Sequence, residues 1–402
     1  MKINLIRGQN QIGGTIIEIT TDETRIFLDV GVELSEKESV VVPDVEGLFV
    51  GDPRCDGVII SHYHSDHLGL TQFLLPEVPI YIGANAYNIV RAAYDYRGRS
   101  FDLNAITFVA NQKFCIGDIE ITPYLCDHSA YDSYMFLIEA DEKSVLYTGD
   151  FRANGRLDYQ ELLTVLPQVD LLLIEGTTLT REESRKNIEE EDLEKIGIEY
   201  LKQKRGPAFI LMSAMNIDRL ITANNIAKAT SRVFLEDIYT ADLVSSLSSE
   251  LPKPNRSNNV RVFTTGGNSL YQRLQKYGDA KIGKREIANT PFLMCIRQSM
   301  ANYLEKLNEL VSFEDGVLFY GMWKGYMEQP EMKEFLASLE QKGIKIHILH
   351  TSGHADVDTI KALIEATKPL LIAPIHTENA DWFKENYPTT NVHTETKEIE
   401  LQ

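Results

Sequence analysis

The 402-residue sequence has no apolar run that approaches the roughly 18 residues of a membrane-spanning helix. Its first residues lack the apolar stretch of a secretory signal. Cysteine is scarce, and the four cysteines that occur form no C-x-x-C pair, which argues against a disulfide framework. These absences exclude the membrane-spanning and disulfide-rich secreted classes. We therefore expect a cytoplasmic protein with no membrane partner.

Positive charge is also scarce, because 40 lysines and arginines face 59 aspartates and glutamates, for a net charge of −19. This balance argues against a broad polybasic surface for DNA or membranes, but it allows a local basic groove. Nucleic-acid backbones are bound by Lys and Arg, and the candidate contacts are Arg91, Arg97, Arg99, Arg256, Arg261, Arg273, Lys276, Lys281, Lys284, Arg285 and Arg297. The densest patch runs from Lys276 to Arg285, where a solvated surface loop is the alternative.

The hydrophobic pattern changes twice along the chain. Up to about residue 174 it predicts short strands and turns, with one helix over 84–97. Strand-like and helix-like segments then alternate from 208 to 342, which is typical of a mainly parallel α/β sheet. A last run of strands and one helix starts at 344. The pattern predicts an α/β protein with one domain formed by residues 1–180 and 344–402 and a second domain, 181–343, inserted into it.

Histidine is rare as well, yet three of the nine histidines lie in the stretch SHYHSDHLG (61–69). On an extended segment His62 and His64 point to the same side, so they can chelate one ion. If a helix starts near Asp66, then Asp66 and His67 project in another direction and suit a second ion. The alternative is a metal-free polar turn, but burying these groups without an ion would require many hydrogen bonds.

Other polar residues of the same kinds follow predicted strands, where α/β layers assemble their sites. They are Asp29, His128, Asp150, Glu175, His354 and His376. One such histidine alone would be read as structural. Together with the 61–69 stretch they form an imidazole-rich set that favours zinc, with manganese or iron as alternatives. Two metal ions about 3.5–4 Å apart share a bridging carboxylate, and Asp150 suits that bridge.

These motifs resemble those of a known superfamily. SHYHSDHLG, the upstream Asp29, His128 and the GD of YTGDFR (147–152) resemble, in order, the motifs of the metallo-β-lactamase fold. LLIEG, HTSGHA and APIHTE, which carry Glu175, His354 and His376, resemble the three extra motifs of its β-CASP branch. The nearest relatives by this resemblance are the RNA-processing metallonucleases of the ribonuclease J type. The resemblance implies an αββα sandwich with an inserted α/β (β-CASP) domain.

The resemblance also implies a role for each residue. Two Zn²⁺ ions are expected, with Mn²⁺ as an alternative: one held by His62, His64 and His128, the other by Asp66, His67 and His376, with Asp150 bridging both. Asp29 and Glu175 would accept hydrogen bonds that orient the site's imidazoles. Asp66, Asp150 and His354 are the expected catalytic residues, and His354 would face the scissile phosphate. Weaker candidates for substrate binding are Ser352, Gly353, Ser213 and Asn216.

The expected function is hydrolysis of RNA phosphodiester bonds, within the strand, from its 5′ end, or both. A hydroxide generated by the zinc pair would attack and leave 5′-phosphate products. RNA is favoured over DNA because RNA-directed members of this branch carry a histidine where the chain has His376. The alternatives are a hydrolase of a small ester, lactone or phosphodiester and a silent scaffold in an RNA-processing assembly. A homodimer is left open.

Overall fold

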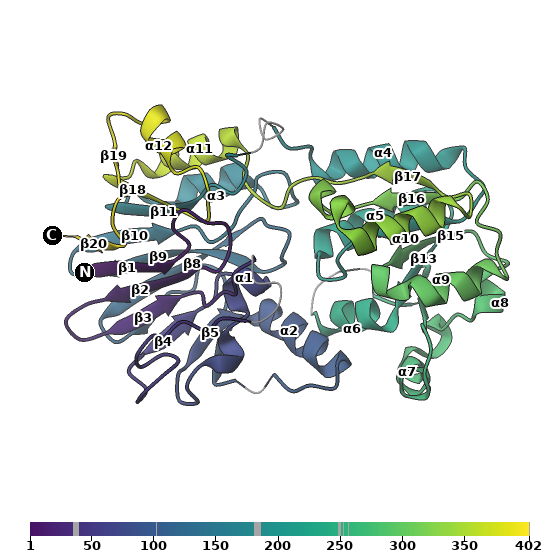
Figure 1. The fold of residues 1–402 in the computed structure, drawn as a ribbon, viewed down its shortest axis with the longest axis horizontal. Helices are drawn as coiled ribbons and strands as arrows, with labels where there is room; N and C mark the ends of the chain where they lie inside the picture. The colour runs from purple at the N-terminus through teal and green to yellow at the C-terminus, as the bar shows by residue number, and fades with distance from the viewer. Residues whose placement is uncertain are drawn as a thin grey trace.

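The computed structural model describes residues 1–34, 40–101, 103–180, 186–247, 251, 253–255 and 257–401. Of the candidate RNA contacts, Arg256 lies outside these residues. The chain forms two units side by side, a β-sandwich from its first and last parts and an α/β unit from its middle (Figure 1). In the described part of the chain, no helix combines the length and apolar character that a membrane crossing requires.

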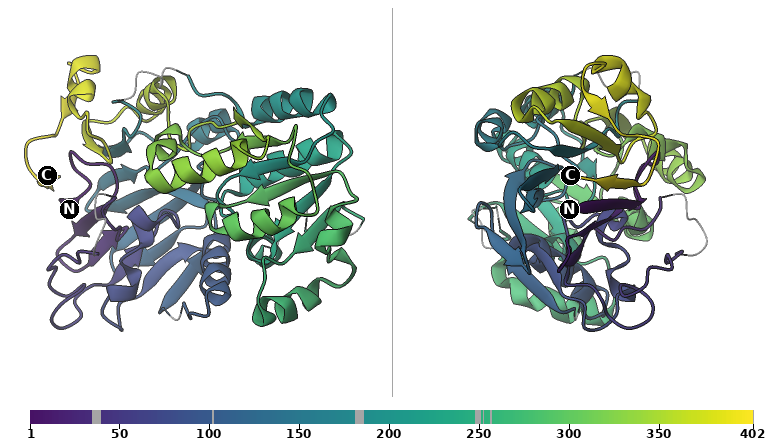
Figure 2. Two further views of the ribbon diagram at one scale, coloured as in Figure 1. Left: turned by 45° about the vertical axis from the view of Figure 1, so that its right-hand side comes forward. Right: turned by 90° about the vertical axis from the view of Figure 1, so that its left-hand side faces the viewer.

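The sandwich consists of two mixed sheets. The first has the order β20-β1-β2-β3-β4-β5-β6, with β1 (Lys2–Arg7), β2 (Ile16–Thr20), β3 (Arg25–Leu28), β4 (Gly57–Ile59), β5 (Ile80–Gly83), β6 (Ala105–Phe108) and β20 (Glu398–Glu400). The second has the order β19-β18-β11-β10-β9-β8-β7, with β7 (Phe114–Ile116), β8 (Ile119–Cys126), β9 (Ser133–Ala140), β10 (Lys143–Tyr147), β11 (Leu171–Glu175), β18 (Leu371–Ile375) and β19 (Asn391–Val392). Because β20 pairs with β1, the two chain ends lie close together (Figure 2).

Apolar side chains from both sheets meet between them. Alternate residues along β2, such as Ile17 and Ile19, pack in this core with Phe136 and Ile138 of β9. Helices α1 (Ser65–Leu68) and α2 (Ala84–Tyr96) cover the outer face of the first sheet. Helices α3 (Tyr159–Val165), α11 (Val357–Thr367) and α12 (Asp381–Asn386) cover the outer face of the second. The layers are α, β, β and α, so the expected sandwich is confirmed.

The middle unit is built on a parallel sheet of order β14-β13-β15-β12-β16-β17. Its strands are β12 (Ala208–Leu211), β13 (Val233–Asp237), β14 (Val260–Phe263), β15 (Phe292–Ile296), β16 (Val317–Tyr320) and β17 (Lys345–Ile348). Helices α4 (Glu190–Lys202), α5 (Ile217–Ala229) and α6 (Ile238–Ser246) pack on one face, and α8 (Lys284–Ile287), α9 (Ala301–Asn308) and α10 (Pro330–Glu340) on the other. Helix α7 (Asn268–Leu274) packs beside α6. Burial from both faces explains why β15 is apolar throughout.

Strand β17 bears on the predicted domain boundary. It pairs in parallel with β16, from Lys345 opposite Val317 to Ile348 opposite Tyr320. The sequence analysis placed residues from 344 onward in the sandwich, whereas this strand belongs to the sheet of the middle unit. We propose that the chain returns to the sandwich after β17. The other predicted boundary adjoins residues 181–185, which lie outside the described residues.

Apolar and ionic contacts join the two units. Helix α2 packs against α6, and one apolar core continues from the first sheet into α4, α5 and α6. Arg152, which follows β10, reaches across the junction and places Nη2 2.6 Å from an Asp218 carboxylate oxygen. Arg219 of α5 pairs at 2.6 Å with Glu190, and the side chains of Arg152, Arg219 and Glu190 are buried. The Arg219–Glu190 pair lies within the middle unit, whereas the pair of Arg152 with Asp218 spans the junction, so that removing either partner there would leave a charge without compensation.

The backbone of the 61–69 segment is held against the first sheet at close range. Thr15 N donates to Asp66 O at 3.1 Å, and Val30 N donates to His67 O at 2.7 Å. Between these contacts lies Gly31, where an added Cβ would fall 1.7 Å from Asp66 O. Only a glycine allows the backbone to approach this closely.

We therefore predict that Gly31→Ala destabilises the protein by about 1–3 kcal/mol, because a side chain must be forced into a packed contact. Urea unfolding followed by circular dichroism measures the effect. Gly283→Ala is the matched control, since an added Cβ meets nothing within 4 Å there. A Gly31→Ala protein as stable as the control variant would show that the segment is not held at this point.

Candidate metal centre

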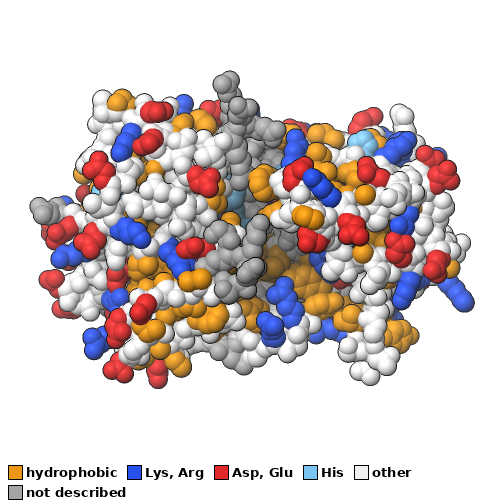
Figure 3. Space-filling view, in the orientation of Figure 1, with side chains coloured by type: hydrophobic (Ala, Val, Ile, Leu, Met, Phe, Trp, Pro, Cys, Tyr) orange, Lys and Arg blue, Asp and Glu red, His pale blue; other side chains and the backbone are white. Residues whose placement is uncertain are grey.

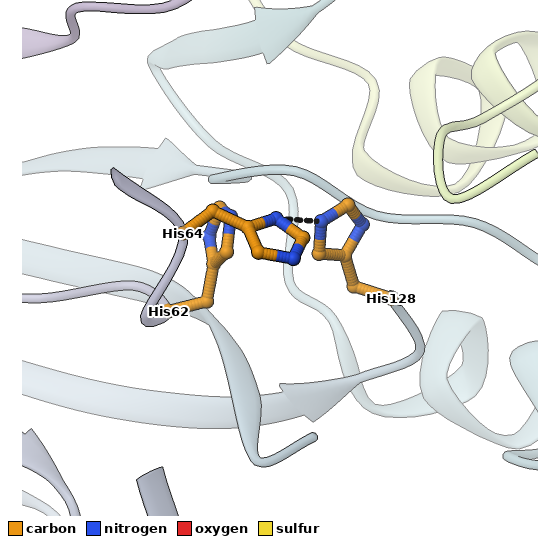
Figure 4. A group of neighbouring side chains, drawn as sticks. All are labelled: His62, His64 and His128. Carbon is orange, nitrogen blue, oxygen red and sulfur yellow. Dashed lines mark hydrogen bonds between the residues drawn. The ribbon is translucent and has the colours of Figure 1, made fainter. Parts of the chain in front are cut away.

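The first group of ligand-type side chains consists of His62, His64 and His128. Their nitrogens lie within 4.8 Å of one another. The first two follow β4, and His128 follows β8, so two different sheets contribute to the group. The imidazoles face one another, with His64 Nδ1 3.1 Å from His128 Nε2 (Figure 4). The other ring nitrogen of His128 contacts the carbonyl oxygen of Gly353, which leaves its Nε2 facing the group.

The second group consists of Asp66, His67, Asp150 and His376, again with ligand atoms within 4.8 Å of one another. The first two lie on α1, Asp150 follows β10, and His376 follows β18. His376 Nε2 lies 3.3 Å from Asp66 Oδ2, although 310 positions separate them in the sequence. All four residues are buried.

Asp150 lies between the two groups. Its Oδ2 is 3.2 Å from His67 Nε2, 3.8 Å from His62 Nε2 and 4.0 Å from His128 Nε2. Its Oδ1 is 3.6 Å from His376 Nδ1. One carboxylate therefore faces imidazoles of both groups, which is the position that a bridging ligand requires.

Asp29 is a buried hydrogen-bond acceptor beside the two groups. Its Oδ2 accepts from His67 Nδ1 at 2.7 Å, from Ser61 Oγ at 2.7 Å and from the Tyr147 hydroxyl. A proton held on Nδ1 leaves the Nε2 lone pair of His67 directed at the cluster. Asp29 has a φ of +56°, a left-handed conformation that costs free energy and that concentrates at functional sites.

Glu175 lies beside His354 in a third group, which overlaps the second through Asp150 and His376. Its Oε1 accepts from the Phe151 amide at 3.0 Å and its Oε2 from the Thr177 amide at 3.2 Å. Oε2 also lies 3.2 Å from His354 Nδ1. Because backbone amides already occupy both oxygens, Glu175 is better placed to orient His354 than to bind an ion. The side chain of His354 is 22% exposed, against 1% for that of His376, so it is the more accessible of the two imidazoles.

Burial and neighbouring charges set the protonation of the cluster. Burial lowers the pKa of His62 and His128 well below the usual range and that of His64 to about 4, so these rings are neutral and can act as ligands. Burial would raise the pKa of Asp150, but the imidazoles of His376, His67 and His354 outweigh it and hold that pKa far below the usual value. Burial disfavours charge on His67 too, yet Asp150 and Asp29 raise its pKa well above normal.

Three atoms in the cluster show that a cation would fit. His62 Nε2, His67 Nε2 and Asp150 Oδ1 are buried and have no hydrogen-bond partner among the described residues. A buried polar atom without a partner costs about 1–3 kcal/mol. Divalent ions held by the two groups would satisfy these atoms, and imidazole with carboxylate is a donor set that zinc accepts. The residues present therefore fit a metal ion.

The weaker substrate candidates lie in two loops. Ser352 and Gly353 precede His354, and the Ser352 carbonyl accepts from Asn154 Nδ2 at 3.2 Å. Asn216 caps α5, where its side chain accepts from Arg219 N at 3.0 Å, so that side chain is engaged within the helix end. Ser213 is exposed after β12, in the same loop.

Three residues near the cluster were missed by the sequence analysis. Tyr63 alternates with the two histidines and points to the middle unit, where its hydroxyl donates to Met215 O at 2.7 Å. Arg152 has a fully buried side chain and holds both Asp127 and Asp218. Thr177 places its hydroxyl 2.7 Å from His376 Nδ1. Period-two alternation could have predicted the direction of Tyr63; no local pattern distinguishes the other two from surface residues.

Comparison with known families agrees with this geometry. The Beta-lactamase superfamily domain matches residues 24–229, half of the chain. The chain belongs to the beta-lactamase superfamily. A second family, described as the Zn-dependent metallo-hydrolase RNA specificity domain, matches residues 343–394, which carry His354 and His376. The membership that the motifs predicted, in the metallo-β-lactamase superfamily and its β-CASP branch, is confirmed.

Individual relatives of this superfamily are distant. The chain is 27% identical over 167 residues to ribonuclease J of Helicobacter pylori, a match to 38% of this chain and 23% of that protein. It is 22% identical to ribonuclease J 1 of Streptococcus pyogenes over 93% of its own length and 68% of the relative. The fold is also similar to the crystal structure of a protein of unknown function from Enterococcus faecalis, with a TM-score of 0.83 at 19% identity. The match covers 100% of the present chain and 99% of the Enterococcus protein, and at this identity it shows the fold alone.

We predict that Zn²⁺ stabilises chelator-treated protein, because an ion that binds only the folded state adds about 2.7 kcal/mol at about 100 times its Kd. The unfolding temperature, followed by intrinsic fluorescence, should rise by several degrees. The double variant His62→Ala/His67→Ala should lose this rise, whereas His393→Ala, outside the cluster, should keep it. Equal rises in all three proteins would place the bound zinc elsewhere.

Proposed function

We propose that this protein is a metal-dependent ribonuclease that hydrolyses RNA phosphodiester bonds with water. The observation that carries the proposal is the convergence of the two ligand groups on Asp150, beside the more exposed His354. The match of residues 343–394 to an RNA specificity domain supports RNA as the substrate and disfavours a small ester or lactone. The relatives named ribonuclease J support the same activity.

Two zinc ions are the proposed cofactors, with manganese as the alternative. His62, His64 and His128 would hold one ion, and Asp66, His67 and His376 the other, with Asp150 shared. Ions bound there would supply Lewis acidity, which would lower the pKa of bound water and polarise a phosphoryl oxygen. Asp29 contributes by holding the Nδ1 proton of His67.

His354 acts on the substrate from the side of the cluster. Its Nδ1 is held by Glu175, so the opposite edge of the ring is presented to the leaving oxygen or to the charge that develops on the phosphate. The loop that carries it is fixed from three sides: Asn187 Nδ2 donates to His354 O at 2.9 Å, and Asn154 and Arg152 donate to Ser352 O. A catalytic histidine held this way keeps one orientation before substrate arrives.

We expect purified protein with zinc or manganese to cleave single-stranded RNA and leave 5′-phosphate ends, because water rather than the 2′-hydroxyl attacks. RNAs labelled separately at each end, resolved on a denaturing gel, distinguish internal cleavage from removal of nucleotides at the 5′ end. A DNA strand of the same sequence tests the preference for RNA.

Asp66→Ala and His376→Ala should lower this activity by roughly 100-fold or more. Removing a residue that only hydrogen-bonds to a metal ligand already lowers activity about 10–100-fold, and removing the ligand itself should lower it at least as much. Zinc content by mass spectrometry of the intact protein should fall from two ions in the parent to one in each variant. His393→Ala should retain both. Parent-like cleavage by the two variants, with their fold intact by circular dichroism, would refute the assignment.

A further inference from the structure

A cavity of about 360 Å³ lies at the junction of the two units. It is lined by Tyr96, Arg97, Tyr239, Thr265, Arg297, Ser299 and Met300. None of these residues belongs to the candidate metal centre. Tyr96 and Arg97 come from the end of α2 in the sandwich, and the others come from the middle unit. In the space-filling view, Lys and Arg side chains gather along the lower part of the seam between the units, the region where α2 and α6 meet (Figure 3).

The cavity occupies a favoured place for a ligand in a parallel sheet. Tyr239 follows β13, Thr265 follows β14, and Arg297 and Ser299 follow β15, so three neighbouring strands present their carboxyl ends to it. Ligands of open α/β sheets bind at this edge. Strand β12 lies next to β15 in this sheet, and the loop after it contains Met215, whose carbonyl oxygen accepts a hydrogen bond from Tyr63 of the 61–69 segment. One edge of the sheet therefore extends from the metal centre to the cavity.

Arg297 has donors left over for a ligand. Its Nη1 donates to Asp237 at 2.9 Å and to Thr240 at 3.2 Å, and its Nη2 contacts the other Asp237 oxygen. A guanidinium has five N–H donors, and these contacts use three. The Nε–H and the remaining Nη2–H have no partner among the described residues. They form the side edge of the guanidinium, a fork that matches two oxygens of one phosphate.

The opposite wall adds a second guanidinium. Arg97 is exposed at the end of α2 and lies close enough to Tyr239 to contact its hydroxyl. The hydroxyls of Thr265 and Ser299 make no hydrogen bond with the described residues, so both can donate to an anion. Two arginines and two hydroxyls at one cavity make a local anion site in a chain whose net charge is −19.

We propose that this cavity binds a backbone phosphate of an RNA strand whose scissile phosphate lies at the metal centre. The inference rests on the proposed ribonuclease function and assigns a second contact to the same substrate. Of the basic residues that the sequence singled out, Arg97 and Arg297 are the two that line this cavity. By contrast, Arg273 forms ion pairs with Asp95 and Asp242, and Lys276 forms an ion pair with Asp242.

The test is binding of 5′-fluorescein-labelled U₁₅ RNA in EDTA, measured by fluorescence anisotropy. Arg97→Gln should weaken binding about tenfold, as expected for the loss of one charge-assisted hydrogen bond. The slope of log K against log[salt] should fall by about 0.7, the value for one phosphate contact to a single strand. Arg297→Lys keeps the charge beside Asp237 and loses the fork, so it should weaken binding while the slope stays the same.

Arg205→Gln is the matched control, because Arg205 is exposed before β12, at the opposite edge of the sheet. U₁₅ binding within twofold of the parent in both cavity variants would overturn the proposal. So would binding of uridine monophosphate that depends on Arg97 while U₁₅ binding does not, since the cavity would then serve a small phosphate ester. Arginine-dependent U₁₅ binding by a protein that cleaves no RNA would count against the ribonuclease and not against the cavity.

Discussion

Burial of one carboxylate among imidazoles is the constraint on which the rest of the structure depends. Asp150 is 2% exposed, and imidazole nitrogens of His62, His67 and His128 lie within 4.0 Å of its Oδ2. Transferring a carboxylate out of water is unfavourable unless charge or hydrogen bonds compensate it. Its neighbours reach it from the ends of β4, β8 and α1, so the sheets must be ordered to bring those ends together.

The backbone accepts strain to make that convergence possible. His376 has a φ of +48° and Asp29 a φ of +56°, and each left-handed residue of this kind costs of order 1–3 kcal/mol. Hydrogen bonds hold both in place: His376 N donates to Gly8 O at 2.7 Å, and Asp29 N donates to Ile59 O at 2.9 Å. The sandwich core is large enough to impose these conformations. In return, the side chains of both residues are directed into the cluster.

The sandwich and the residues of the cluster could be predicted from the sequence, because histidine is rare in this chain and is concentrated at the cluster. The spacing of the ligand-type residues in HYHSDH predicts that they point in two directions, toward two metal ions. The polar residues that follow strands are predicted to meet at one end of the sheets. The pattern of short strands up to residue 174 gives no bounds for strand β8, which contains Pro123, and a proline usually argues against a strand interior. Strand β17 shows a different difficulty: the loop after this edge strand carries His354, which favours grouping it with the sandwich in the sequence, whereas its pairing with β16 lies in the middle sheet.

What local sequence cannot supply is the coupling between the two units. Arg152 lies two residues after Asp150, yet its partners are Asp127 in the sandwich and Asp218 in the middle unit. Removing one partner of a buried pair costs about 3–5 kcal/mol, because the other charge is left without compensation. The same guanidinium donates to Ser352 O in the loop of His354. The position of the middle unit and the orientation of His354 therefore depend on one set of contacts.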